Sequence, residues 1–93
     1  MELKLRGLKH RNFETLPVVQ ADKKQLKQFG ENLRRLRKEK SLSQEQLAFE
    51  AQLDRSFVGQ VERGERNLSL LSILRLADAL KIPPEKLFSG DSQ

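Results

Sequence analysis

Hydrophobic side chains recur at a helical spacing through most of the chain after residue 21. From about residue 22 to residue 40 they fall three or four positions apart, and Lys, Arg, Glu and Gln fill most of the positions between them. The hydrophobic members of this set are Leu26, Phe29, Leu33 and Leu36. An α-helix places residues at this spacing on one side. The pattern therefore predicts a first amphipathic helix with a single buried stripe.

Two short helices are predicted in the middle of the chain from their capping residues. Ser43 opens a capping box, because its hydroxyl can accept from the Gln46 N–H while the Gln46 side chain reaches back. Asp54 is expected to cap a further helix over Arg55–Arg63, which Gly64 ends in the left-handed conformation. The residues expected on the inward side of the two helices are Leu47, Ala48, Ala51, Val58 and Val61.

The connection between these two helices is three residues long, from Gln52 to Asp54. A link of this length does not let the second helix fold back alongside the first. The two helices are therefore expected to cross at a steep angle.

The later part of the chain predicts one more helix and a final turn. Ser69 is expected to cap a helix over residues 70–80, and the residues Ile82–Pro84 to end it. The residues expected to face the core are Ile73, Leu74, Ala77 and Leu80, together with Leu87 and Phe88 of the turn over residues 84–88. This leaves Leu71 and Leu76 as spare hydrophobic residues.

The composition limits the chemistry that the chain can perform. Its 93 residues, 37% hydrophobic and 33% charged, fit one small domain. Cysteine is absent and the one histidine is His10, so disulfides, thiolate metal sites and cysteine nucleophiles are excluded. Phosphate-binding glycine loops and paired metal-ligand spacings are also absent, and we expect no enzyme, metal or cofactor. A secretory signal and a membrane-spanning run are lacking, which favours a cytoplasmic location.

Positive charge is concentrated in the first half of the chain. The net charge of +5 divides into twelve Lys/Arg against five Asp/Glu in residues 1–40, and six against eight in residues 41–93. A basic half favours a polyanionic partner such as nucleic acid. Simple solubility explains the same charge, so charge alone leaves both interpretations open.

The hydrophobic spacing after residue 43 matches a twenty-residue helix-turn-helix unit that begins at Gln44. Hydrophobic residues occupy its positions four, eight, ten, fifteen and eighteen, and the small Ala48 occupies position five. With the run DRSFVGQVERGERNLSL, the chain from about Gly30 to Phe88 resembles the phage repressor and Cro family of transcriptional regulators. Gln52 stands where that family usually has glycine, and a left-handed conformation there costs roughly 1 kcal/mol.

The resemblance implies an all-α, compact five-helix, lambda-repressor-like DNA-binding domain over residues 22–93, after an N-terminal extension of residues 1–21. The second helix of such a unit lies in the major groove. In the family, residues matching Arg55, Ser56 and Gln60 read base edges. Arginine can form two hydrogen bonds with guanine, and glutamine can do so with adenine. A phosphate contact or a solvated charge stays open for Arg55, and a plain surface role for Gln60.

The resemblance also implies contacts with the DNA backbone. The glutamine matching Gln44 binds a phosphate in the family and braces the start of the second helix of the unit, and the loop after Gly64 contacts the backbone. The residues expected at the backbone are Ser43, Gln44, Arg66 and Asn67, and a solvated loop charge stays open for Arg66. Apart from the resemblance, Lys38 near the end of the first helix is expected to add long-range attraction to the backbone. Phe57 either packs on the core or meets a thymine methyl group, and we expect packing.

A buried ion pair is a further implication of the resemblance. Arg37 and Glu62 match an arginine and a glutamate that the family buries between the first helix and the DNA-reading helix. No metal site is implied.

The function expected from the resemblance is a sequence-specific repressor that binds double-stranded DNA at a palindromic operator as a homodimer. We expect the pairing surface in the later part of the chain, with Leu71, Leu76 and the turn at Leu87 and Phe88. An antitoxin that binds operator DNA and a toxin protein is the alternative. Residues 1–21 would serve as a basic arm along DNA or as an edge strand for a protein partner, or form a disordered extension.

Overall fold

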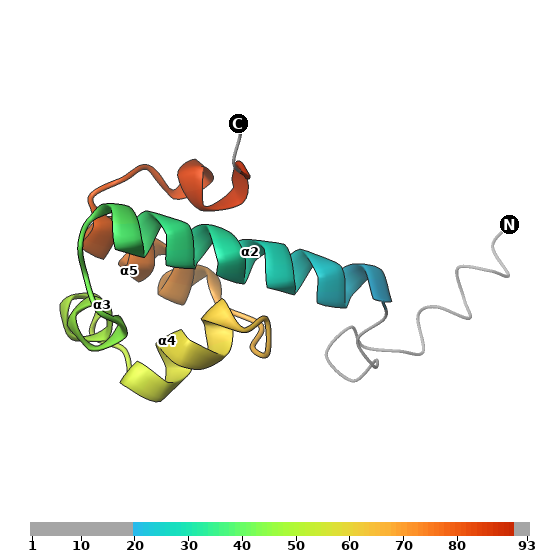
Figure 1. Cartoon of the computed structure of the whole chain (residues 1–93), viewed down its shortest axis with the longest axis horizontal. Coiled ribbons are helices and arrows are strands. Elements are labelled where there is room, and N and C mark those ends of the chain that lie inside the picture. The colour runs from blue at the N-terminus through green and yellow to red at the C-terminus, as the bar shows by residue number, and fades with distance from the viewer. Residues whose placement is uncertain (1–19, 91–93) are drawn as a thin grey trace, which may run out of the picture.

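Four α-helices and one 3-10 helix make up residues 20–90, the part of the chain that the computed structural model describes (Figure 1). They are α2 (Gln20–Glu39), α3 (Gln44–Ala51), α4 (Arg55–Glu62), α5 (Leu70–Leu80) and the 3-10 helix η2 (Pro84–Phe88). The all-α class is confirmed, with the last of the five predicted helices present as the 3-10 turn. The predictions for the N-terminal extension fall mainly on residues 1–19, which lie outside the described residues.

The long helix α2 lies across the shorter ones. In Figure 1, α4 runs below α2, η2 lies above it, and α3 is seen end-on at the side of α4. The steep crossing of α3 and α4 agrees with the three residues that separate Ala51 from Arg55. A short second helix is thereby held out from the body of the domain at a fixed angle.

The hydrophobic core fills the space between α2 and the other helices. Phe29, Leu33 and Leu36 of the predicted stripe are buried, and Leu26 is half-buried. The remaining buried hydrophobic residues are Leu47, Ala48, Ala51, Val58, Val61, Leu76, Ala77, Leu80 and Leu87. The inward faces predicted for α3 and α4 are therefore confirmed.

Helix α5 presents a different side to the core from the one predicted. Leu76, expected to be spare, is fully buried, whereas Leu74, expected inside, is 42% exposed. The face toward the core consists of Ile73, Leu76, Ala77 and Leu80. Phe88, expected to close the core, is 61% exposed, although its ring lies 5.2 Å from that of Phe29. Hydrophobic residues surround most of α5, so the sequence allows two stripes at helical spacing, and contacts with the neighbouring helices select one.

The helix ends follow the capping residues, with one exception. The capping box of Ser43 and Gln46 is formed in both directions, and the hydroxyl of Ser69 accepts from the backbone of α5. Asp54 precedes α4 as expected, but its side chain makes no capping hydrogen bond. Gln52 adopts the left-handed conformation after α3, with φ 60° and ψ 44°.

Two glycines allow α2 to lie directly against the end of α4. A Cβ atom on Gly30 would stand 2.3 Å from the carbonyl oxygen of Val61 and 2.6 Å from that of Glu62. One on Gly64, where φ is +76°, would stand 2.8 Å from the Cα of Lys27. No side chain fits at these distances, so the two backbones meet without one between them. This contact fixes how α4 is held beneath α2.

Candidate nucleic-acid interface

Helix α4 has a buried side and an exposed polar side. Val58, Val61 and Glu62 are buried between α2 and α3. Arg55 and Ser56 are exposed on the opposite side, and Gln60 is partly exposed. These last three are the residues predicted to read bases, and the structure brings them together on the outer surface of α4.

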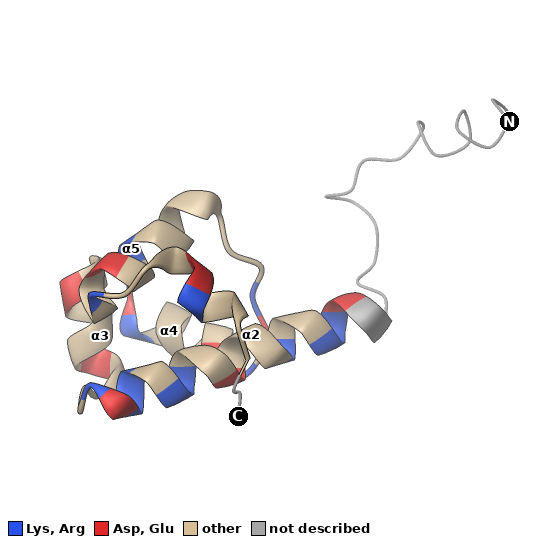
Figure 2. Ribbon diagram, turned by 90° about the horizontal axis from the view of Figure 1, so that it is seen from above, with Lys and Arg blue, Asp and Glu red and all other residues tan. Residues whose placement is uncertain are grey.

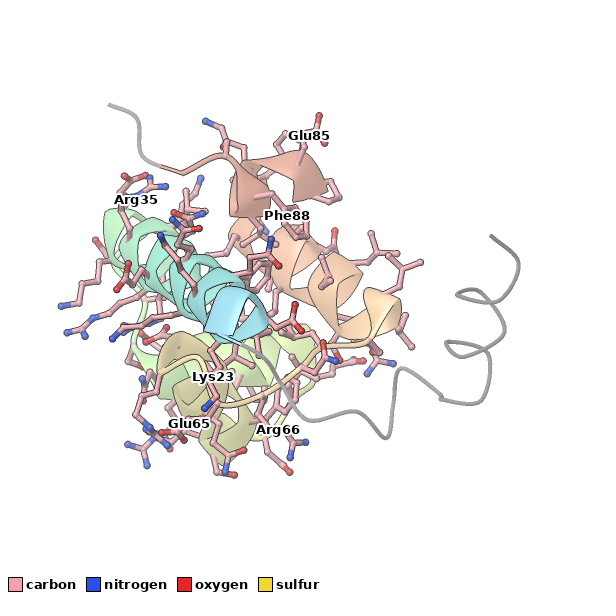
Figure 3. The ribbon with its side chains drawn as sticks, turned by 90° about the vertical axis from the view of Figure 1, so that its right-hand side faces the viewer. Lys23, Arg35, Glu65, Arg66, Glu85 and Phe88 are labelled. Atoms are coloured by element: carbon pink, nitrogen blue, oxygen red, sulfur yellow. The ribbon has the colours of Figure 1, made fainter. Side chains whose placement is uncertain are left out.

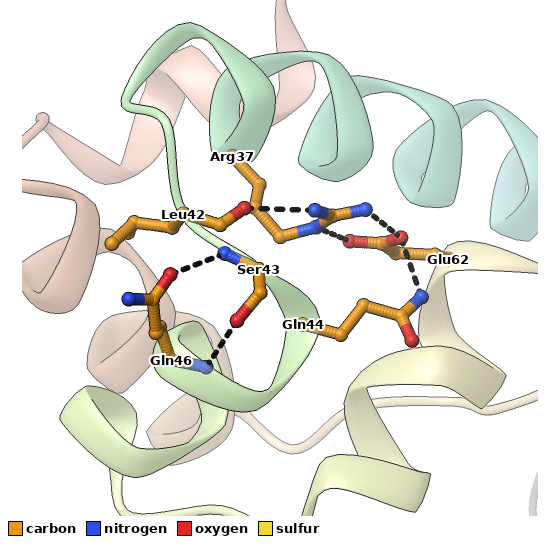
Figure 4. A network of polar contacts seen from close by, with 6 residues as sticks. All are labelled: Arg37, Leu42, Ser43, Gln44, Gln46 and Glu62. Atoms are coloured by element: carbon orange, nitrogen blue, oxygen red, sulfur yellow. Dashed lines mark hydrogen bonds and ion pairs between the residues drawn. The ribbon is translucent and has the colours of Figure 1, made fainter.

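A network of polar contacts joins α2, α3 and α4 behind this surface (Figure 4). Arg37 donates from Nε to Glu62 Oε2 at 2.6 Å and from Nη2 to Glu62 Oε1 at 3.0 Å. Its Nη1 donates to the carbonyl oxygen of Leu42 at 2.8 Å. The two side chains are only 9% and 3% exposed. Charges removed from water in this way are stable together only when each is hydrogen-bonded, as here.

Gln44 belongs to the same network. Its Nε2 donates to Glu62 Oε1 at 2.9 Å (Figure 4). The resemblance implies that Gln44 braces the start of α4, but in the structure its side chain contacts Glu62, the last residue of α4. Ser43 caps α3 through its hydroxyl, directly before Gln44. The N-terminus of α3, where unpaired N–H groups favour an anion, is therefore held in place from α4.

The loop after α4 carries the second group of predicted backbone contacts. Arg66 and Asn67 are exposed. The guanidinium carbon of Arg66 lies 5.1 Å from the centre of the Phe57 ring. Phe57 itself is half-buried and packs against the core, as the packing interpretation expected. Its outer side thus supports Arg66, at a distance typical of a cation–π contact.

The other charged residues of this surface are exposed. Arg63 donates from Nε to Glu65 Oε2 at 3.0 Å, and this hydrogen bond, with the charge of Glu65, raises the pKa of Arg63. Lys38 lies exposed near the end of α2. Figure 2 shows Lys and Arg toward both ends of α2. The positive charge predicted for the first half of the chain thus lies partly on this helix.

Sequence reasoning missed two features of the site. Gly30 and the bond between Gln44 and Glu62 both depend on contacts between helices, and a period-based analysis of one chain does not show them. In residues 20–90, no group of three or more His, Cys, Asp or Glu side chains could hold a metal ion. No helix in the same part of the chain is long and hydrophobic enough to cross a membrane.

Comparisons with known proteins agree with this geometry. A sequence model described as helix-turn-helix matches residues 33–87. The crystal structure of the restriction-modification controller protein C.AhdI from Aeromonas hydrophila is 62% identical, covers 68% of this chain and 96% of that one, and superposes with a TM-score of 0.67. Control protein C.BamHI of Bacillus amyloliquefaciens is 45% identical over 60 residues, 63% of this chain and 74% of its own.

A third relative is control protein C.MunI of a Mycoplasma species, 44% identical over 62 residues, which are 66% of this chain and 84% of that protein. The matched region contains α3, α4 and the polar network that joins them to α2. The chain belongs to the phage repressor and Cro-like helix-turn-helix family, whose members are DNA-binding transcriptional regulators and not enzymes.

Proposed function

We propose that this protein is a repressor that controls restriction-modification genes by binding a palindromic operator as a homodimer. The observation that carries the proposal is its 62% identity to a restriction-modification controller protein over 96% of that protein's length. The helix-turn-helix match over residues 33–87 includes α4, whose outer side is the surface that would distinguish operators. A short, rigidly held recognition helix fits this task, because its side chains must meet base edges in a fixed register.

Sequence readout would come from the outer side of α4. Arg55 is exposed at its first turn and has the two-pronged donor geometry that guanine O6 and N7 accept. Gln60, about 1.4 turns later, can pair with adenine N6 and N7. Ser56 lies between them and accepts or donates to either. These side chains are not used to hold the fold, which leaves them available to the DNA.

Phosphate contacts would position the protein on both sides of α4. Ser43 and Gln44 lie at the N-terminus of α3, and Gln44 is held there by Glu62. Arg66, supported by Phe57, lies after α4 with Asn67, and Lys38 adds charge from α2. Such contacts set orientation and carry no sequence information directly.

Pairing would use the hydrophobic residues that α5 and η2 leave exposed. Leu70 is 70% exposed and Leu71 is 56% exposed, and Leu74 and Phe88 are exposed as well. Leu71 and Phe88 belong to the surface predicted from the sequence, whereas Leu76 and Leu87, also predicted there, are buried in the core. Exposed hydrophobic groups of this kind mark interaction surfaces. A symmetric pair would present its two α4 helices about 34 Å apart, to successive major grooves.

Selection of binding sites from random duplex DNA tests the proposal, followed by footprinting of the selected sequence. We expect a footprint with dyad symmetry and two half-sites one helical turn apart. Sedimentation of Leu70→Glu with Leu71→Glu should show a monomer, while the parent protein sediments as a dimer. A footprint without symmetry, or a monomeric parent protein at full operator occupancy, would contradict the homodimer.

Control of restriction-modification genes has its own test. The selected operator should lie upstream of genes for a restriction endonuclease or its methyltransferase, and a reporter placed behind it should fall when the protein is expressed. A rise in the reporter would contradict repression while keeping DNA binding. A toxin or other protein partner bound through residues 1–21, and the cytoplasmic location, stay predictions.

A further inference from the structure

Basic residues form a stripe along one side of α2. Lys23, Lys27, Arg34 and Lys38 follow one another by four, seven and four positions, and all four are exposed. At 3.6 residues per turn, these steps keep the side chains within a narrow sector of the helix. Lys38 is one of the residues proposed above to contact the DNA backbone. The two lysines at the other end, Lys23 and Lys27, have no role in the helix-turn-helix unit, which begins at Gln44.

The structure ties this end of α2 to the loop that follows α4. The Cβ position of Gly64 lies 2.8 Å from the Cα and 3.1 Å from the N of Lys27, so the two backbones touch. Arg66, two residues after Gly64, is a predicted phosphate contact. Figure 3 shows Lys23, Glu65 and Arg66 on the same side of the molecule, the lower side in that view. The two lysines therefore extend the surface on which Arg66 lies, in the direction away from α4.

Neither lysine has a carboxylate partner in the part of the chain that the structure describes. The ion pairs there are Arg35–Glu39, Arg37–Glu62 and Arg63–Glu65. Glu65, which lies in this loop between Gly64 and Arg66, is already paired with Arg63. The positive charge of Lys23 and Lys27 is available to an external anion.

We propose that Lys23 and Lys27 form a second phosphate-binding surface, for double-stranded DNA that flanks the base pairs met by α4. Their positions are separated by about 6 Å along the helix axis, and flexible stems carry the ammonium groups, so each lysine reaches a phosphate of its own. This surface lies outside the helix-turn-helix unit and lengthens the bound DNA segment. The inference rests on the proposed DNA-binding function and adds a surface to it.

The test compares two full-length double variants that lose the same charge. Lys23→Gln with Lys27→Gln removes the proposed surface. Lys81→Gln with Lys86→Gln is the matched control: Lys86 is on η2, which lies on the opposite side of α2 from α4 (Figure 1), and Lys81 follows α5, outside the helix-turn-helix unit. All four lysines are exposed, so both variants should melt like the parent protein. Binding to the selected operator and to a random duplex is measured between low and high salt.

Loss of two phosphate contacts should lower the slope of log K against log salt by roughly 1.8 per bound subunit. We expect this for Lys23→Gln with Lys27→Gln on both duplexes, with unchanged preference between them, and no change for the control. On a duplex trimmed to the base pairs met by α4, the parent protein should bind only as tightly as the variant does.

An unchanged slope for the α2 variant, or an equal fall for the control, would overturn the proposed surface. A trimmed duplex that the parent protein binds as tightly as the long one would also overturn it. These results leave the proposed function intact as long as the parent protein prefers the operator to the random duplex. If that preference is absent, the proposed function itself fails.

Discussion

Polar side chains on the two sides of α4 lie in different surroundings. On the inner side, Glu62 is buried and bonded to Arg37 and Gln44. On the outer side, Arg55, Ser56 and Gln60 make no hydrogen bond through their side chains to the rest of residues 20–90. The polar groups of the inner side are hydrogen-bonded to one another and hold α2, α3 and α4 together. Those of the outer side remain free to bind a partner.

This difference separates folding from recognition within eight residues. A helix as short as α4 is not stable alone in water, so its position depends on the inner side. The outer side contributes little to that position and can vary without loss of the fold. Substitutions on the two sides should therefore affect different properties: stability for the inner side and DNA binding for the outer side.

The largest expected effect is that of Glu62→Ala on stability. It leaves the buried guanidinium of Arg37 without its partner, which should lower the free energy of unfolding by about 3–5 kcal/mol. Chemical denaturation measures this directly. The control replaces both charges, Arg37→Met with Glu62→Leu, and should cost less than Glu62→Ala because no unpaired charge remains. Equal melting of Glu62→Ala and the parent protein would show that the pair does not hold the helices.

A smaller loss of stability is expected for Gly30→Ala. Its new Cβ would stand 2.3 Å from the carbonyl oxygen of Val61, so α2 and α4 must move apart. Overpacking of this kind costs about 1–3 kcal/mol.

Gly59→Ala on α4 is the matched control for Gly30→Ala. Its nearest atom is the flexible Nη1 of Arg63 at 3.4 Å. Relief of the cost of a glycine inside a helix should stabilise this variant by roughly 0.5–1 kcal/mol. If the two glycine variants unfold alike, the contact between α2 and α4 is not tight.

For the outer side, the expected loss is in DNA binding. Arg55→Ala and Gln60→Ala should each weaken binding to the operator by about 1–3 kcal/mol. Their unfolding midpoints should match that of the parent protein, because neither side chain holds the fold. Titration of labelled operator duplex and a denaturation curve for each variant give the two numbers. A variant that lost binding and stability together would remove the distinction between the two sides of α4.

The smallest effect is expected for Arg66→Ala. Its loss should weaken binding to all sequences alike and lower the slope of log K against log salt by about one per bound subunit. Phe57→Leu complements Arg66→Ala, because it keeps the guanidinium of Arg66 and removes the aromatic ring that lies 5.1 Å from it. A change in base preference for Arg66→Ala would show that this residue reads sequence.

Capping residues and hydrophobic period were enough to predict the helices. Ser43 and Ser69 mark the starts of α3 and α5, and Gly64 takes the left-handed conformation after α4. These signals are local, so one chain carries them in full. The outer side of α4 could be predicted for the same reason, since Val58 and Val61 define the opposite side.

The features that could not be predicted depend on contacts between distant segments. Leu74 is exposed and Leu76 is buried, the reverse of the prediction. Helix α5 is hydrophobic nearly all round, so only contacts with its neighbours decide its rotation. Gln44 bonds to Glu62, eighteen residues away, and not to the nearer start of α4. Glycine is needed at position 30 because two carbonyl groups of α4 approach it too closely for a side chain. Residue type and spacing alone do not specify such approaches.

The most direct test of the account is a comparison of base preferences. Binding sites are selected from random duplexes by the parent protein, by Arg55→Ala and by Gln60→Ala, with Arg75→Ala, an exposed arginine of α5, as control. If the outer side of α4 reads sequence, each α4 variant should lose preference at one base pair per half-site and keep the rest, and the control should select the parent's site. Retention of the full preference by both α4 variants, with affinity lowered equally for every sequence, would contradict the account.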